Sequence, residues 1–259
     1  MSSYPFRRQV LSLVWGAAPL CVFLGLLLIW EAISRVQLVK PSVLPGAWAA
    51  LETLLALLKG GSIWVEMGAS VRRLAVALSV GEAAGFLVGL AMWRLPLIGR
   101  GWRPILSSLY AMPLSAFYPA LLLAAGVSDV PVVILGAIAA FVPVAIATSI
   151  GLAEVRLALR KVAAVFQCSW WQTLLKVFLP AALPDIVAGT RLAITYSFIY
   201  VIALEFINAS DGLGFQIRFT YEFFRPREMY AYIVLVVTIA LMQHSLLDFV
   251  QKRLSRHFG

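Results

Sequence analysis

The sequence predicts an all-α, polytopic membrane protein with six transmembrane helices. Of its 259 residues, 62% are hydrophobic and only 13% are charged, and the mean hydropathy is +0.92. A soluble domain would be closer to half apolar and a quarter charged, because it must cover its outside with polar groups. The apolar residues instead gather in runs of about 20, enough to cross about 30 Å of hydrocarbon as a helix. A soluble globular fold and a disordered chain are excluded, and solid apolar runs are unlike the alternating segments of a β-barrel.

Six segments have the length and hydropathy of a span, and they form one transmembrane domain over residues 1–259. The net charge of +9 resides largely in short loops beside these runs, so we assign the basic residues to topology rather than to nucleic-acid binding. Their distribution favours a cytoplasmic position for both termini. The spans run approximately over residues 11–33, 74–93, 105–126, 131–152, 186–207 and 230–250.

The first run follows Arg7 and Arg8, as the apolar region of a signal peptide does. It is longer than the apolar h-region of a typical signal peptide and no clear small-x-small cleavage site closes it, so we predict a retained span. Residues 34–71 then form an external stretch. Its helical-looking piece Trp48–Leu58 is too short to span, and we expect it on the outer surface or packed on the bundle.

The second span carries Gly81, Gly85 and Gly89, which a four-residue spacing places on one helical face. Glycine lets another backbone approach closely, and such packing is a main source of helix association in lipid. The default interpretation is helix packing within the bundle, and the alternative is a subunit interface or a moving contact. The neighbouring Glu82 must face protein or water, because a lipid-facing carboxylate is costly.

Prolines interrupt the third span at Pro113 and Pro119 and the fourth at Pro143. Each removes a backbone donor and is expected to bend its helix. Structural kinks are the default interpretation. Bent helices also mark transporter pathways, so the third span is a candidate pore wall, with Pro113 and Phe117 as candidate pathway or gate residues.

The segment between the fourth and fifth spans, residues 154–185, is long, basic and amphipathic. Val162, Val165 and Phe166 share one helical face, and a turn is expected at Cys168–Ser169. A second apolar stripe follows, which Pro180 is expected to close. A cytoplasmic helix–turn–helix with apolar faces fits either a helix pair on the membrane surface or docking into a groove of a cytoplasmic protein.

Glu205 is the clearest intramembrane charge, near the outer end of the fifth predicted span, and His244 lies in the sixth. Glu205 is either a functional group or a structural hydrogen-bond partner of the loop that follows it, and we weigh these interpretations equally. His244 is more typical of a packed histidine than of a ligand. Cys21 lies in the first apolar run and Cys168 in a basic cytoplasmic loop, so we expect neither a disulfide nor a metal site.

The segment around residue 161 resembles the cytoplasmic "EAA" loop of binding-protein-dependent ABC transporter permeases. The pattern E-A-A, three residues, G, nine residues, an apolar residue, L and P falls on Lys161-Val162-Ala163, Gln167 and Phe178-Leu179-Pro180. The subfamily it most resembles is the nitrate/sulfonate/taurine type. Further stretches that carry the resemblance are KPSVLP, SVRRLAVALSVGEAAGFLVGLAM, PILSSLYAMPLSAFYPALLLAAG and ALEFINASDGLGFQI.

Two departures from this pattern concern the loop itself. In the family the loop forms coupling helices that insert into a cleft of the ATPase, and its glycine permits a turn that is costly for other residues. Gln167 stands in place of that glycine, so a different turn is expected. Lys161 stands in place of the usual Glu and reverses a charge at the contact. Either the ATPase carries a compensating change, or this chain is the degenerate half of a heteromeric pair.

The resemblance implies a permease subunit of an ATP-driven importer in the bacterial inner membrane, moving a small anionic or polar organic solute. The implied partners are a second permease chain, two cytoplasmic ATP-binding subunits, an external solute-binding protein and membrane lipid, with no nucleic acid. We expect no cofactor or metal on this chain, which lacks a G-x-x-x-x-G-K-[ST] loop, and ATP and Mg²⁺ in the partner ATPase. The implied coupling loop comprises Lys161, Val162, Ala163, Ala164, Phe166, Gln167, Cys168, Ser169, Trp170, Leu179 and Pro180.

Two other classes compete with this interpretation. An integral-membrane enzyme would need nucleophiles, bases or metal ligands at workable spacing, and the sequence supplies no such cluster. A channel or scaffold subunit would need no ATPase. A neighbouring gene for a Walker-A ATPase, with a secreted binding protein beside it, would discriminate the importer from the channel.

Overall fold

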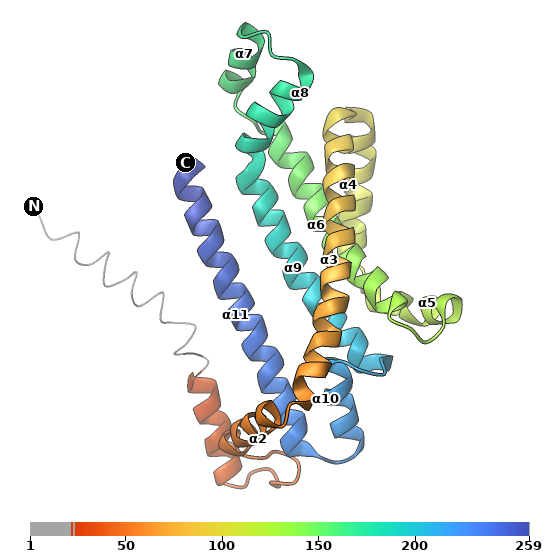
Figure 1. Ribbon diagram of the computed structural model, residues 1–259, viewed down its shortest axis with the longest axis vertical. Helices are drawn as coiled ribbons and strands as arrows, with labels where there is room; N and C mark the ends of the chain where they lie inside the picture. The colour runs from red at the N-terminus through yellow and green to blue at the C-terminus, as the bar shows by residue number, and fades with distance from the viewer. Residues whose placement is uncertain (1–21, 23, 259) are drawn as a thin grey trace, which may run out of the picture.

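The computed structural model describes residues 22 and 24–258, and this part of the chain is helical without a strand. Residues 24–35 form the first described helix. The remaining elements run in the order shown in Figure 1: α2 Ala47–Gly60, α3 Ser62–Arg94, α4 Pro96–Ala111, the 3₁₀ turn η1 Leu114–Phe117, α5 Tyr118–Ala125, α6 Val130–Ala153, α7 Leu157–Val165, α8 Trp170–Thr173, the π-helical turn η2 Leu174–Phe178, α9 Leu179–Asn208, α10 Leu213–Glu222 and α11 Pro226–Phe258.

Helix α6 is the centre of the bundle and packs between α3 and α9. It is apolar all round, as expected of a helix that meets protein on most sides. Leu114 and Tyr118 pack against Leu135 of α6 and Leu204 of α9 in one buried cluster. The three long helices therefore form a common core, onto which the shorter elements attach.

The glycine stripe of α3 faces α6. A Cβ atom added to Gly85 would lie 2.6 Å from the carbonyl oxygen of Phe141, and one added to Gly89 would lie 2.6 Å from that of Ala145. Gly81 meets α6 in the same way, one turn earlier. The stripe is thus covered by a helix of the same chain, with the backbones too close for any side chain.

Four described helices are long and apolar enough to span a membrane, and the count rises to five if a bent pair forms one span. The predicted span over residues 11–33 lies mostly outside the described residues, so six spans remain a prediction. Helix α3 is longer than its predicted span, because it begins at Ser62. The predicted short external helix is present as α2, which packs on α11.

The third predicted span is divided in two. Helix α4 ends at Ala111, and the η1–α5 segment continues at an angle of 85°. Met112 is extended, the conformation imposed on a residue that precedes proline, and this residue breaks the helix before Pro113. Pro119 sits in the first turn of α5, where a missing N–H costs nothing, and so it starts a helix rather than kinking one.

The bundle has two distinct ends (Figure 1). Helices α7 and α8 protrude at the same end as the turn between α3 and α4. Helices α2 and α10 lie at the opposite end, where α11 begins. On the predicted topology, the α7–α8 end is cytoplasmic and the α2–α10 end is external.

Candidate functional site

The candidate site is the α7–α8 hairpin, which we define as residues 156–173. The turn between its helices closes with two backbone bonds: Cys168 N–H donates to the carbonyl of Ala163 at 3.1 Å, and Gln167 N–H to that of Ala164 at 3.0 Å. This Schellman pair ends α7 and requires a left-handed residue between the helices. Gln167 supplies it with a φ of 49°.

The expectation that Gln167 forces a different turn is therefore wrong. The position has the left-handed conformation that glycine favours, and glutamine adopts it. The two closing bonds compensate for the steric cost, because they satisfy carbonyls at the end of α7 that would otherwise lack a donor.

The second helix of the hairpin begins at a capping box. Ser169 Oγ accepts from the backbone N–H of Gln172 at 3.3 Å, and the Gln172 side chain accepts from the N–H of Ser169 at 2.9 Å. Both donors would be unpaired at a bare helix start. Only Gln167 and Cys168 separate this cap from the C-cap of α7 at Phe166, so the hairpin is tightly defined by its own backbone.

Pro180 does not close the second helix, contrary to expectation. The chain stays helical from Trp170 through α8, η2 and α9. Within η2 the helix widens, and Leu179 N–H donates to the carbonyl of Leu174, five residues back. A wide turn relieves the clash between a proline ring and the preceding turn, so the helix passes the proline. The hairpin is consequently continuous with the core helix α9.

Arg160 ties α7 to the bundle. Its Nε donates to the carbonyl of Val155 at 3.0 Å, a terminal nitrogen donates to the carbonyl of Ala153, and its guanidinium lies 5.6 Å from the ring centre of Phe178. Ala163 is buried on the same helix. These contacts fix one side of α7, and none of the described residues covers its other side.

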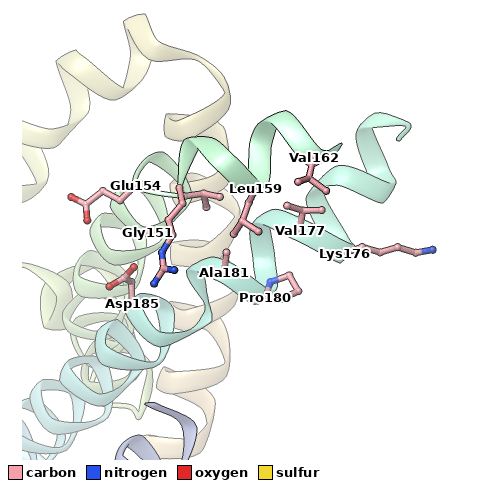
Figure 2. Close-up of a pocket in the computed structure, with 11 residues that line it drawn as sticks. Gly151, Glu154, Leu159, Val162, Lys176, Val177, Pro180, Ala181 and Asp185 are labelled. Atoms are coloured by element: carbon pink, nitrogen blue, oxygen red, sulfur yellow. The ribbon is translucent and has the colours of Figure 1, made fainter. Parts of the chain in front are cut away.

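A groove of about 410 Å³ runs between α7 and the start of α9 (Figure 2). It holds charges of both signs, since Glu154 and Asp185 line it together with Arg156 and Lys176. Leu159, Val162 and Val177 supply its apolar part, and Figure 2 shows their side chains projecting between the two helices. The hairpin is thus backed by a polar groove rather than by a filled core.

The end of the hairpin presents apolar side chains to the surroundings. Val165 is 79% exposed and Phe166 75% exposed, and Trp171 is exposed at the start of the second helix. Lys161, Ala164 and Gln167 are exposed beside them. Isolated exposed apolar residues are ordinary, but a cluster on a well-ordered basic hairpin is typical of a surface that a partner covers.

The other candidate residues lie near or at the external end. Phe117 is exposed at the end of η1, whereas Glu205 is fully buried. Arg73 is 2% exposed and donates to Glu205 at 2.8 Å, to Asp129 at 2.7 Å and to the backbone carbonyl of Asp211 at 2.9 Å, with a further ion pair to the Asp211 carboxylate. We call Arg73, Asp129, Glu205 and Asp211 the external ion cluster.

Glu205 also accepts from the backbone N–H of Gly214 in the first turn of α10, so a structural hydrogen bond is present, with a donor just beyond the predicted loop. The start of α10 is held by side chains of α3 and α9, which satisfy donors that have no partner within the helix. Gly212 N–H donates to Glu66 at 2.6 Å, Leu213 N–H to Ser70 at 2.9 Å and Gly214 N–H to Glu205 at 3.1 Å.

Asp129 lies just before the start of α6, outside the spanning helices. Its burial alone would raise its pKa, but hydrogen bonds from Arg73 and Arg72 outweigh that effect and hold the pKa below the ordinary aspartate value. The charged form therefore stabilises the fold. The sequence did not single out Arg73, which directly precedes the predicted second span.

Comparisons with known proteins were made on the whole chain. Residues 81–258 match the family described as binding-protein-dependent transport system inner membrane component. The taurine transport system permease protein TauC of Escherichia coli is 29% identical over 99% of this chain and 93% of the relative. The aliphatic sulfonates transport permease protein SsuC of Bacillus subtilis, whose name is qualified as putative, is 28% identical over 87% of this chain and 82% of the relative.

Solved structures give the same fold. A chain from an inward-facing structure of the MetNI methionine ABC transporter aligns with a TM-score of 0.59 and 18% identity, covering 74% of this chain and 95% of that chain. At this identity the likeness concerns the fold alone. The helical bundle thus has a counterpart of known structure.

Proposed function

Because the chain belongs to the family of binding-protein-dependent transport system inner membrane components, we propose that it is the permease subunit of an ATP-driven importer that lines the solute pathway. Its role is mechanical: ATP hydrolysis takes place in a separate cytoplasmic subunit, and the bundle switches between inward-open and outward-open states. Such a switch requires partners that bind the two states with different affinity. The family description places the chain in the inner membrane, and we propose cytoplasmic termini.

The observation that carries the proposal is the exposed apolar end of the α7–α8 hairpin. Val165, Phe166 and Trp171 protrude on a hairpin whose backbone is closed by caps at both helix ends. We call these three side chains the apolar knob. An exposed apolar surface of fixed shape is more stable when a groove of a partner covers it than when it faces water. Because η2 makes the hairpin continuous with α9, movement of the knob would be transmitted directly into the core.

The proposed solute is a small anion or zwitterion. The relatives named above are described as transporting taurine and aliphatic sulfonates, and a nitrate import permease, NrtB of Leptolyngbya laminosa, is 29% identical over 74% of this chain. An external binding protein would select the solute. The proposed assembly has two permease chains, two ATPases that hold ATP and Mg²⁺, and one binding protein, all in or against the membrane.

The positive charge of the hairpin favours a partner with a negatively charged surface at the contact. Lys161 is exposed beside the apolar knob, and Arg156 and Lys176 line the groove behind it. We propose that the ATPase presents an acidic rim at this contact, since like charges would weaken the complex. This is the compensating change that the substitution of Lys for Glu requires.

The proposal is tested by placing a carboxylate on the knob. Ala164→Glu should abolish co-purification of the ATPase encoded beside the permease and solute uptake, while insertion into the membrane is unchanged. Ala158→Glu is the matched control, because Ala158 is exposed on the same helix but lies two turns, about 10 Å, back from Val165 at the tip of the hairpin. Unchanged assembly and uptake with Ala164→Glu would overturn the coupling role. Uptake that persists without any ATPase would instead favour the channel alternative.

A further inference from the structure

The turn between α10 and α11 repeats the closure seen at Gln167, this time at the external end. Arg225 N–H donates to the carbonyl of Thr220 at 2.8 Å, and Phe224 N–H to that of Tyr221 at 3.1 Å. The residue between these bonds is again left-handed, and here it is Phe224, with a φ of 51°. A bulky residue in this conformation is a steric outlier, since glycine occupies such positions at no cost.

The two closing bonds offset the backbone strain at Phe224, but they do not require a phenylalanine. Within the described part of the chain its side chain is 92% exposed, and Tyr221 and Phe223 beside it are exposed as well. A glycine would close the same two bonds without strain and without an apolar ring in water. A contact outside the described part of the chain would account for the phenylalanine.

A groove lies directly beside the aromatic turn. It has a volume of about 420 Å³ and carries the charges of Arg225, Arg227 and Glu228. Arg225 and Glu228 lie 3.6 Å apart and both are partly exposed, so Arg227 is left as the excess positive charge. The aromatic turn and this groove together form the outer patch, whose residues are Tyr221, Phe223, Phe224, Arg225, Arg227 and Glu228.

The outer patch is held at a fixed distance from the bundle core. Helix α10 starts against Glu66, Ser70 and Glu205 and runs away from the external ion cluster to the end of the molecule opposite α7 and α8 (Figure 1). Its ten residues cover about 15 Å as a helix. Arg73 lies at the outer limit of the predicted second span, so the patch projects beyond that limit into the external compartment.

We propose that the outer patch is a docking contact for the external solute-binding protein, with Phe224 as its aromatic anchor and an acidic edge on the partner facing Arg227. The proposal rests on the importer function proposed above. An exposed, rigid aromatic ring with a base beside it has the composition of a binding hot spot. The distance beyond the ion cluster favours a soluble protein over lipid as its occupant.

The test uses the complete permease–ATPase complex in nanodiscs and, as the probe, the labelled secreted binding protein encoded beside the permease. Phe224→Gly should weaken binding at least tenfold and should at the same time raise the melting temperature, because it removes a left-handed phenylalanine. Gln37→Gly is the matched control, since Gln37 is also left-handed, with a φ of 55°, and lies outside both the outer patch and the coupling hairpin. It should raise the melting temperature and leave binding of this protein unchanged. Arg227→Glu should slow association.

Three results would overturn the proposal. The first is wild-type affinity of Phe224→Gly for the binding protein. The second is an equal loss of affinity in Gln37→Gly, which would make the effect indirect. The third is strong quenching of a bimane label on Phe224→Cys by brominated lipids, with Cys21 and Cys168 replaced by serine, which would place the ring in the bilayer. A wild-type complex that binds no external protein would instead contradict the importer function itself.

Discussion

The left-handed turn of the α7–α8 hairpin allows the reasoning on strain to be tested at one residue. Gln167 has a φ of 49° between two closing hydrogen bonds, and its side chain is exposed. A non-glycine residue pays about 1–2 kcal/mol for this conformation. Glycine avoids that cost but loses about 0.5–1 kcal/mol through the greater freedom of its unfolded chain. Gln167→Gly should therefore stabilise the protein by about 0.5–1 kcal/mol.

The assay is thermal unfolding of the purified permease in detergent, where this gain corresponds to a rise of about 2 °C. Gln167→Ala is the decisive control, because alanine removes the same side chain but keeps a Cβ atom in the left-handed region. It should give no rise. If both variants raise the melting temperature equally, the gain comes from the loss of the glutamine side chain, and the strain argument is refuted.

Three further predictions concern the core and the external ion cluster. Gly85→Ala should lower the free energy of unfolding by about 2 kcal/mol, because its Cβ would meet the carbonyl of Phe141 at 2.6 Å. Gly68→Ala is the control in the same unfolding assay. It has open space around it on the same helix, so the substitution should be neutral or slightly stabilising. Glu205→Gln should lower the free energy of unfolding in detergent by about 3 kcal/mol, because it removes a charge from a buried ion pair. Wild-type stability of this variant would show that the pair contributes nothing. The pKa of Asp129 is lowered, so its contribution is complete above the ordinary aspartate pKa of about 3.9 and is lost as the pH falls through the lowered value. Asp129→Asn should therefore flatten the acid limb of the stability–pH curve, and an unchanged limb would contradict this assignment.

Local patterns in the sequence predict some of the fold well. Four-residue spacing identified the face that Gly81, Gly85 and Gly89 present, since helical periodicity alone determines a face. Pro113 marked the break in the third span, because proline restricts the residue before it whatever the surroundings. The same logic fails at Pro180, where a wide turn accommodates the ring and the helix continues.

The external ion cluster shows why the rest was not predictable. The partners of Arg73 at Asp129, Glu205 and Asp211 lie 56, 132 and 138 residues away along the chain. No periodicity or spacing links residues at such separations, so only the packing of α3, α6 and α9 brings them together. The left-handed residues Gln167 and Phe224 were hidden for another reason. Neither residue type signals that conformation, and the pattern of neighbours gives a turn without its handedness.

The central claim is that the apolar end of the α7–α8 hairpin contacts a cytoplasmic ATPase. The most direct measurement replaces Phe166 by the photo-crosslinking analogue p-benzoylphenylalanine in the permease co-expressed with the neighbouring ATPase, and compares it with the same replacement at Phe224 on the opposite end. Illumination should join the ATPase to residue 166 and should give no ATPase adduct at residue 224. The absence of an ATPase adduct at residue 166, in a complex that still takes up solute, would contradict the claim.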